Sequence, residues 1–310
     1  MDTEENMDFK YIIEDIYKTI SSQENSGQVA NYIPELSLVD PSKFGVCLRT
    51  IENQKYGVGD WEHKFSIQSI SKVLSLSLAY KILGDDIWDR VGVEPSGNPF
   101  NSLIQLETDN GIPRNPFINA GAMVICDMLI SHCKNAKVEF LEFIHRISFN
   151  DQINYSEAVV QSELSVGYRN IALCNFIKSF GNIDNDPSEV LDFYFHICSI
   201  EMSCSELSQC FLFLTDNNFK DSENKKVLTT SQAKRINAIM LTCGFYDESG
   251  EFSFKVGLPG KSGVGGGIIA LHPNKYTIAV WSPRLNERFN SNRGMQFLES
   301  FTTETKLSIF

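Results

Sequence analysis

The chain has 310 residues, and its 39 Asp and Glu residues outnumber its 27 Lys and Arg residues, for a formal net charge of -12 at pH 7. This length can bury a sizeable core, as one large domain or two intimate lobes. With 42% hydrophobic and 21% charged residues, the composition is typical of an ordinary globular protein. The acidic balance disfavours binding to nucleic acid or to anionic lipid. No apolar run reaches the ~18 residues that a membrane span needs.

The N-terminal region and the cysteines both bear on where the protein works. The first residues are acidic where a secretory signal would be basic, which predicts a cytoplasmic protein. The eight Cys form no C-x-x-C pair and lie mostly in apolar stretches, so we expect buried free thiols. No His is spaced with another His or Cys as in a metal site, so a metal centre is not expected.

The first half of the chain is predicted to begin with a helix and a pair of strands. Apolar residues at helical spacing predict a helix over residues 8–20. The segment 44–50 and the stretch around Tyr56 have the character of two strands joined by a turn. Helical segments are expected from Ser69 to about Ile177, with a break over the Gly- and Pro-rich region 91–116.

The second half is predicted to contain three more helices and then strands. The helices are expected over 188–200 with Ser188 as N-cap, over 204–215, and over 231–241 after a polar loop at 216–226. The segments 250–257, 265–272 and 275–283 resemble strands, and a last helix is expected over 292–301.

This order of elements predicts an α+β fold. An antiparallel sheet closes most simply if the N-terminal strands pair with the C-terminal ones, with flanking helices and a large helical insertion packed on the sheet. We expect a single domain over 1–310, in which a sheet lobe takes about 1–68 and 245–310 and a helical lobe takes about 69–244.

The pattern S-x-x-K places a serine nucleophile and a lysine one helical turn apart. It occurs four times, at Ser69/Lys72, Ser131/Lys134, Ser222/Lys225 and Ser231/Lys234. The pair at 222 lies in a polar loop, Lys134 suits a helix C-terminus and Ser231 suits an N-cap. Only Ser69 opens a long apolar helix directly after a strand-like segment.

Ser69 and Lys72 have the placement that a nucleophile and its activating group need. Residues i and i+3 share a helix face, so the Lys72 amine can reach the Ser69 hydroxyl. The helix N-terminus offers free N–H groups to a developing oxyanion, and apolar surroundings favour the neutral amine. The alternative is that Ser69 is an N-cap and Lys72 a solvated charge, and from these residues alone both stay open.

A glycine-rich segment over 257–268, GLPGKSGVGGGI, carries the second signal. Its GKS suggests a phosphate-binding loop, but Lys255 holds the place of the first Walker glycine and a strand follows where a helix is needed. We favour the K-T-G element that accompanies S-x-x-K in serine acylases, here Lys261-Ser262-Gly263. Its glycines would let the backbone approach a substrate closely. A flexible turn between two strands is the alternative.

Together with these elements, long segments in the same order make the chain resemble the serine-dependent glutaminases, which have the β-lactamase and penicillin-binding-protein type of fold. The matching segments cover roughly residues 28 to 300. They are NYIPEL at 31, FSIQSISK at 65, EPSG at 94, NPFINAGA at 115, QSELSVGYRN at 161, DFYFHICSIE at 192, CGFYDESG at 243, GLPGKSGVGGG at 257 and WSP at 281.

The resemblance implies a role for each of nine residues. Ser69 would be the nucleophile and Lys72 its activating partner, with Tyr246 relaying protons. Tyr194 would lie beside the leaving ammonia, and the oxyanion would meet the backbone N–H groups of Ser69 and Val264. The amino-acid end of glutamine would be held by Tyr32, Asn119, Glu163 and Asn170. An ammonium is well matched by a carboxylate such as Glu163.

Each of these residues has an ordinary structural alternative. Taken singly, Tyr194 and Tyr246 would be core tyrosines, Asn119 a turn or cap residue, and Glu163 a solvated acid. As an ordered set they favour the functional interpretation.

Three functional hypotheses follow from this set. The first is hydrolysis of L-glutamine to L-glutamate and ammonia through a Ser69 acyl-enzyme, without a cofactor and, as the resemblance implies, in a homodimer or homotetramer. Which of Lys72 and Tyr246 is the principal base stays open. The second is a penicillin-recognising acylase or β-lactamase, and the third is a glutamine-sensing binding module.

Overall fold

A five-stranded antiparallel sheet forms the centre of the molecule in a computed structural model that describes residues 7–96 and 103–310. The strand order is β3-β2-β8-β7-β6. The strands are β2 (Gly45–Thr50), β3 (Lys55–Gly59), β6 (Gly260–Ser262), β7 (Gly267–His272) and β8 (Tyr276–Trp281). In the register of β2 and β8, Gly45 lies opposite Trp281 and Thr50 opposite Tyr276. The predicted closure of N-terminal on C-terminal strands is therefore confirmed.

Two short ladders lie outside this sheet. β1 (Gln28–Val29) pairs with β9 (Arg284–Leu285), and β4 (Phe65–Ser66) pairs with β5 (Glu201–Met202). Within the described residues, 3-10 helices connect the larger elements: η1 (Pro34–Leu38), η2 (Gln68–Ile70), η3 (Gly84–Asp89), η4 (Leu212–Leu214) and η5 (Tyr246–Glu248).

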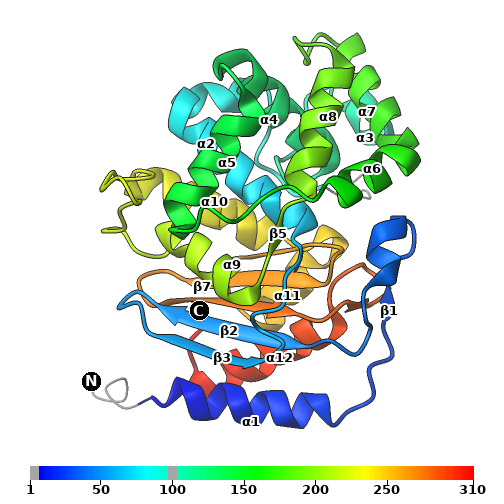
Figure 1. The fold of residues 1–310 in the computed structure, drawn as a ribbon. Coiled ribbons are helices and arrows are strands. Elements are labelled where there is room, and N and C mark those ends of the chain that lie inside the picture. Colours follow the sequence, from blue (N-terminus) through cyan, green and yellow to red (C-terminus); the bar gives the residue numbers. More distant parts are fainter. Residues whose placement is uncertain (1–6, 97–102) are drawn as a thin grey trace.

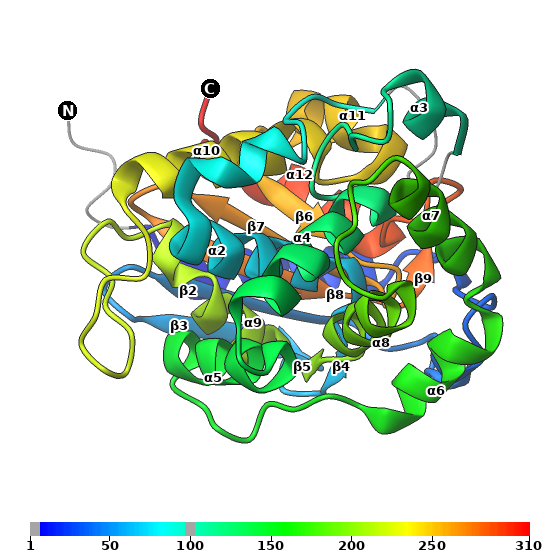
Figure 2. The same cartoon turned by 90° about the horizontal axis from the view of Figure 1, so that it is seen from above.

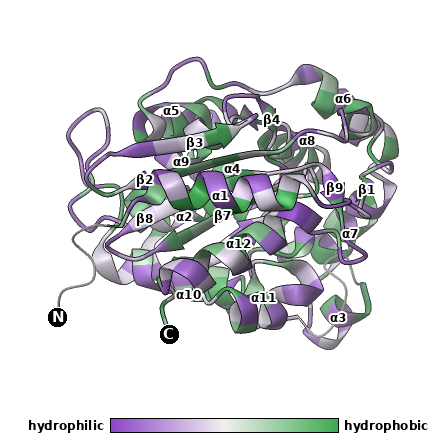
Figure 3. Cartoon of the chain, turned by 90° about the horizontal axis from the view of Figure 1, so that it is seen from below, coloured by the Kyte–Doolittle hydropathy of each residue, from purple (hydrophilic) through white to green (hydrophobic). Residues whose placement is uncertain are grey.

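One face of the sheet is covered by the first and last helices of the chain, α1 (Phe9–Ser21) and α12 (Asn292–Thr305) (Figures 1 and 3). Asp8 caps α1 by accepting a hydrogen bond from the Tyr11 N–H. Hydrophobic residues recur along α1 at helical spacing, and Ile13, Ile16 and Ile20 are buried against the sheet side. The predicted opening helix is confirmed, with each end one residue later.

The opposite face carries the helical block (Figure 2). Its helices are α2 (Ser71–Leu83), α3 (Leu103–Thr108), α4 (Asn119–His132), α5 (Ala136–Ser148), α6 (Glu157–Val166), α7 (Tyr168–Ser179), α8 (Pro187–Cys198), α9 (Cys204–Cys210) and α10 (Thr230–Cys243). The helix α11 (Ser249–Lys255) follows and packs against α10. The Gly- and Pro-rich break before α4 lies partly outside the described residues.

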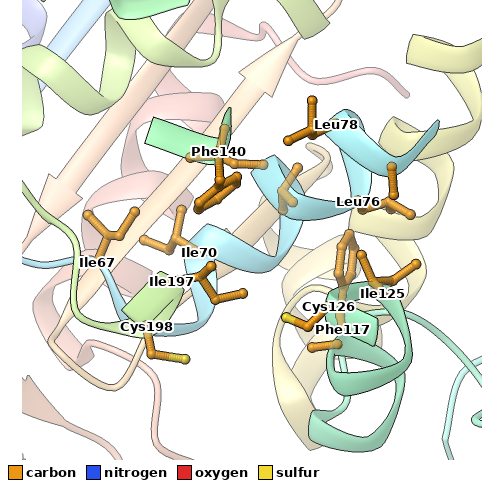
Figure 4. Packing of buried hydrophobic residues seen from close by; sticks show 14 of the residues in the cluster. Ile67, Ile70, Leu76, Leu78, Phe117, Ile125, Cys126, Phe140, Ile197 and Cys198 are labelled. Carbon is orange, nitrogen blue, oxygen red and sulfur yellow. The ribbon is translucent and has the colours of Figure 1, made fainter. Parts of the chain in front are cut away.

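The main hydrophobic core lies between the sheet and this block, around α2 (Figure 4). Ten of the thirteen α2 residues are buried, so α2 has no solvent-facing stripe along most of its length. Ile67 and Ile70 enter the core just before α2, and Ile197 and Cys198 meet them from α8 (Figure 4). This packing fixes the start of α2 against the sheet. In the described part of the chain, no helix has both the length and the apolar character that crossing a bilayer requires.

The structure corrects several details of the sequence prediction. The segment 250–257 is not a strand, because α11 takes its residues up to Lys255. Its alternating Phe residues mislead because Phe252 and Phe254 lie two apart, on opposite sides of the helix, with Phe252 buried and Phe254 exposed. The caps of α8 and α10 are Asp186 and Thr229, in place of the predicted Ser188 and Ser231.

Candidate active site

A cavity of about 660 Å³ opens where the helical block meets the edge of the sheet. Eight of the nine predicted site residues line it: Tyr32, Ser69, Asn119, Glu163, Asn170, Tyr194, Tyr246 and Val264. The ninth, Lys72, is fully buried behind the wall. Of the four S-x-x-K serines, only Ser69 lines this cavity. Segments from 32 to 264 of the sequence therefore meet at one place.

Ser69 lies at the turn where the chain enters α2. It belongs to the 3-10 helix η2, and the α-helix begins two residues later, at Ser71. The preceding residue, Gln68, has a φ of 49°, a left-handed conformation that is uncommon for a residue with a side chain. The turn directs the Ser69 side chain toward the cavity while Ile67 and Ile70 stay in the core.

Lys72 lies one turn further along and is held in place from α4. Its Nζ donates to Asn119 Oδ1 at 2.6 Å and to the carbonyl oxygen of Phe117 at 3.3 Å. Burial lowers the pKa of Lys72 to about 8, against the weaker opposing influence of nearby acidic groups. About a tenth of the amine is therefore neutral at pH 7, far more than for an exposed lysine, and a base has to be neutral.

Tyr246 approaches Ser69 from the opposite wall. Its pKa is raised by burial, while hydrogen bonds with the Ser69 side chain and with the backbone N–H of Val264 act in the other direction. Tyr246 also has a left-handed backbone, with a φ of 51°. The Ser69 side chain thus lies close enough to Tyr246 to influence its pKa, whereas Lys72 donates to the Phe117 carbonyl oxygen and to Asn119. The sequence predicted that the Lys72 amine can reach the Ser69 hydroxyl directly, whereas the hydrogen bonds of Lys72 given above go to Phe117 and Asn119.

Glu163 is a buried carboxyl group in α6, only 7% exposed. Burial raises its pKa to about 7, although a hydrogen bond with Gln68 and the charge of Lys72 both favour the carboxylate. The interpretation of Glu163 as a solvated acid is wrong. Burying a carboxylate costs free energy, and a cationic ligand in the cavity would offset this cost.

The amide side chains of α4 and α7 complete this wall. Asn119 uses its Nδ2 to donate to Asn170 Oδ1 at 3.0 Å, so the two amides and Lys72 form one chain of hydrogen bonds. Tyr194 is buried in α8, and its ring centroid lies 5.8 Å from Lys72 Nζ. Tyr32 lies at the mouth and remains 46% exposed, with its ring against Phe289.

The glycine-rich segment plays a different part from the one the sequence suggested. Lys261 and Ser262 lie inside the edge strand β6, and neither lines the cavity. A Cβ atom at Gly263 would lie 2.4 Å from the Ile67 carbonyl oxygen, and one at Gly265 would lie 2.2 Å from that of Ser66. These glycines therefore let the loop that carries Val264 approach the backbone just before Ser69.

Several cavity residues were not singled out from the sequence. Gln68 and Cys198 line the inner wall, and Arg169, Arg288 and Phe289 line the outer part. Gln68 directly precedes the nucleophile candidate, but its left-handed backbone and its bond to Glu163 have no sequence signature. Within residues 7–96 and 103–310, no cluster of three His, Cys, Asp or Glu side chains is arranged to hold a metal ion.

Comparison with known proteins decides the family. The sequence model of the glutaminase family matches residues 27–310. The chain is 56% identical to a glutaminase of Saccharophagus degradans over 98% of this chain and 99% of that protein. It is 54% identical to one of Christiangramia forsetii over 98% and 100%. The chain belongs to the glutaminase family.

Solved structures of glutaminases have the same fold. A probable glutaminase, YbaS, superimposes with a TM-score of 0.91 at 33% identity over 97% of both chains. A Bacillus glutaminase superimposes with a TM-score of 0.86 at 32% identity over 97% of this chain and 99% of its own. The predicted α+β, β-lactamase-like fold is confirmed. Among the three functional hypotheses, membership of this family selects the glutaminase.

Proposed function

We propose that this glutaminase hydrolyses L-glutamine to L-glutamate and ammonia through a glutamyl ester on Ser69. The observation that carries the proposal is Ser69 in the cavity wall, beside Tyr246 and one helical turn from a buried lysine with a pKa of about 8. Nucleophilic catalysis by serine requires such an adjacent proton acceptor.

In the acylation step, Ser69 Oγ attacks the side-chain amide carbon of glutamine and a carbon–oxygen bond forms. The hydroxyl proton passes to the neutral amine of Lys72, directly or through Tyr246. The carbonyl oxygen becomes an oxyanion, which the backbone N–H groups of Ser69 and Val264 stabilise. The carbon–nitrogen bond then breaks, and the leaving nitrogen takes up a proton beside Tyr194 and departs as ammonia.

In the deacylation step, a water molecule attacks the ester carbon. Its proton passes to the same acceptor, the carbon–oxygen bond to Ser69 breaks, and Ser69 recovers its proton as glutamate leaves. Every group in the cycle belongs to the chain or the substrates, and no cofactor takes part.

Recognition of the amino-acid end is assigned to Tyr32, Asn119, Glu163 and Asn170. Glu163 pairs with the α-ammonium of glutamine, while the Tyr32 hydroxyl and the amides of Asn119 and Asn170 donate to its α-carboxylate. Support comes from the carboxyl group of Glu163, which is buried, lines the cavity and has its pKa raised to about 7 by burial.

The wider setting follows from the family resemblance. We propose that the chain works as one domain, as a homodimer or homotetramer, in the cytoplasm. Light scattering on the purified protein measures the assembly, and a mass equal to one chain would contradict it.

The first test is ammonia release from glutamine, with asparagine as the matched substrate. Wild-type protein should release ammonia from glutamine, and the Ser69→Ala variant should lose turnover while keeping its circular dichroism spectrum. A folded Ser69→Ala protein with normal turnover would exclude the covalent route. Release from asparagine at the same rate would contradict the assigned substrate.

A further inference from the structure

Lys261 is a buried lysine that the proposed reaction does not use. It is 1% exposed in β6, behind the wall of the cavity. Its Nζ donates to the carbonyl oxygens of Ser262 at 2.6 Å and of Gly244 at 3.0 Å. Among the residues that the structure describes, no carboxylate lies within ion-pair distance of Lys261.

The Gly244 carbonyl oxygen is the anchor of the turn that leads to Tyr246. It also accepts hydrogen bonds from the backbone N–H of Ser262 at 3.2 Å and from the Ser262 hydroxyl at 3.4 Å. Three donors from β6 therefore converge on one carbonyl group at the C-terminal end of α10. The chain then turns sharply, and two residues later Tyr246 has its left-handed φ of 51°.

Lys261 also touches the Tyr246 side chain. Its Nζ lies 4.7 Å from the centroid of the Tyr246 ring. A left-handed tyrosine persists only where its surroundings hold it, because the conformation costs free energy by itself. Lys261 therefore acts on Tyr246 in two ways. It binds the Gly244 carbonyl oxygen before the turn, and it packs against the Tyr246 ring after the turn.

We propose that Lys261 is a positioning residue that holds the Tyr246 hydroxyl in line with Ser69. This inference rests on the proposed role of Tyr246 in moving the Ser69 proton. It gives the lysine of the K-S-G segment a task that does not require contact with substrate, in agreement with its place outside the cavity.

A purely structural role explains the site less well. Burial, together with repulsion from Lys72, lowers the pKa of Lys261 well below its usual value, which shows that the amino group is costly to bury here. An apolar side chain of the same length would fill this space without that cost. The amino group is therefore placed where its hydrogen bonds matter to the neighbouring turn.

The experiment compares steady-state kinetics on glutamine for wild type, Lys261→Met, Tyr246→Phe and the double variant. Methionine keeps most of the length of the side chain and removes the donors. Lys261→Met should lower kcat about 10- to 100-fold, in the range of a lost proton-transfer contribution, and change KM by less than about threefold. In the Tyr246→Phe background the same substitution should cost less than about threefold, because the two residues act as one unit.

The matched control is Thr277→Val on β8. Thr277 is likewise buried and likewise donates to a backbone carbonyl group, that of Ser208 at 2.8 Å, but it lies opposite Leu271 of β7 and does not line the cavity. It should lose stability without losing kcat. Losses that multiply in the double variant, or a wild-type kcat for Lys261→Met, would overturn the inference. If Tyr246→Phe itself retains full kcat, the proposed role of Tyr246 fails instead.

A second variant covers the case in which Lys261→Met does not fold. Lys261→Arg keeps a donor for the Gly244 carbonyl oxygen, so the variant should remain folded. It enlarges the group against the Tyr246 ring, so kcat should fall while KM is retained. A folded Lys261→Arg protein with unchanged kcat would show that Tyr246 needs no such support.

Discussion

At the scale of single residues, two buried ionisable groups give the site its character. Burial lowers the pKa of Lys72 to about 8 and raises that of Glu163 to about 7. Both shifts have the same cause, the loss of water around a charge, and both reduce the stability of the empty protein. Each shift suits the role proposed for its group, with Lys72 as a base and Glu163 as the partner of the α-ammonium.

The stability cost of Glu163 is measurable. Because its pKa rises from 4.5 to about 7 on folding, the native state binds more protons than the unfolded chain between these values, and stability falls as the pH rises through this window. Glu163→Gln should therefore raise the unfolding free energy at pH 8 by up to about 3 kcal/mol. Urea unfolding at pH 8 and pH 4.5 tests this, and the difference should vanish at the lower pH. If Glu163→Gln left the stability at pH 8 unchanged or lowered it, the Glu163 carboxylate would be compensated by groups of the chain itself.

The pH dependence of kcat/KM reports the same two groups in the free enzyme. Activity should rise with pH through about 7 as Glu163 ionises and through about 8 as Lys72 loses its proton. In Glu163→Gln the lower step should disappear and the step near 8 should remain. The two groups interact, so the steps belong to the pair in the wild-type protein. If both steps remained in the variant, the step near pH 7 would not belong to Glu163.

The proposed pairing of Glu163 with the α-ammonium also predicts how specificity changes in a variant. Glu163→Gln should weaken the reaction of glutamine by about 2–5 kcal/mol, as for a broken buried ion pair. A glutamine analogue without the α-amino group should lose much less. We would compare kcat/KM for both compounds on both proteins. Equal losses would show that Glu163 supports the fold and does not bind the ammonium.

Asparagine probes the same geometry from the substrate side. Its side chain is one methylene shorter, so with its ammonium at Glu163 its amide carbon cannot also reach Ser69. A misplacement of this size at the reacting carbon can cost ~100-fold.

At the scale of elements, helix α4 links Lys72 to the asparagine side chains that are proposed to bind the substrate. Its first residue, Asn119, accepts from Lys72 and donates to Asn170. The helix can begin there because the preceding loop passes very close to it, and Gly121 is the point of closest approach. A Cβ atom at Gly121 would lie 2.0 Å from the Asn115 carbonyl oxygen.

Gly121→Ala should therefore displace the start of α4 or the loop. Such overpacking costs about 1–3 kcal/mol, and because it moves Asn119 it should also lower kcat/KM. Gly250→Ala is the matched control, since a Cβ atom in that helix meets nothing within 4 Å and should leave activity unchanged. Urea unfolding and glutamine kinetics on both variants measure the effects. A Gly121→Ala protein with wild-type values would contradict this packing.

Much of the element pattern could be predicted, because periodicity reports burial directly. The strands β2, β7 and β8 and the helices α1 and α12 were all predicted from alternating or helical spacing. The strand prediction for α11 was wrong because two Phe residues in alternation fit either pattern. The side-chain direction of Lys261 and the left-handed turns at Gln68 and Tyr246 could not be predicted, because they depend on which segments meet in space.

At the scale of the whole molecule, the cavity joins the two parts of the fold. Tyr32, Tyr246 and Val264 come from segments beside the sheet, whereas Asn119, Glu163 and Tyr194 come from the helical block. Ser69 lies at the junction, at the start of the buried helix α2. A ligand that touches both walls should therefore stabilise the molecule as one unit.

Glutamate, the product, provides the test of this coupling. At 100 times its Kd it should raise the unfolding free energy by about 2.7 kcal/mol. Thermal unfolding should show a single transition that moves to higher temperature with glutamate and moves much less in Glu163→Gln. Two separate transitions in the wild-type protein would contradict the proposal of one domain.

The central claim is that Ser69 carries the glutamyl group, and covalent labelling tests it most directly. A glutamine analogue with a diazoketone in place of the side-chain amide should react once per chain, and peptide mass spectrometry should locate the adduct on Ser69. The Ser69→Ala protein should remain unlabelled under the same conditions. An adduct on Tyr246, on Cys198 or on another residue, with Ser69 unmodified in the wild-type protein, would contradict the account.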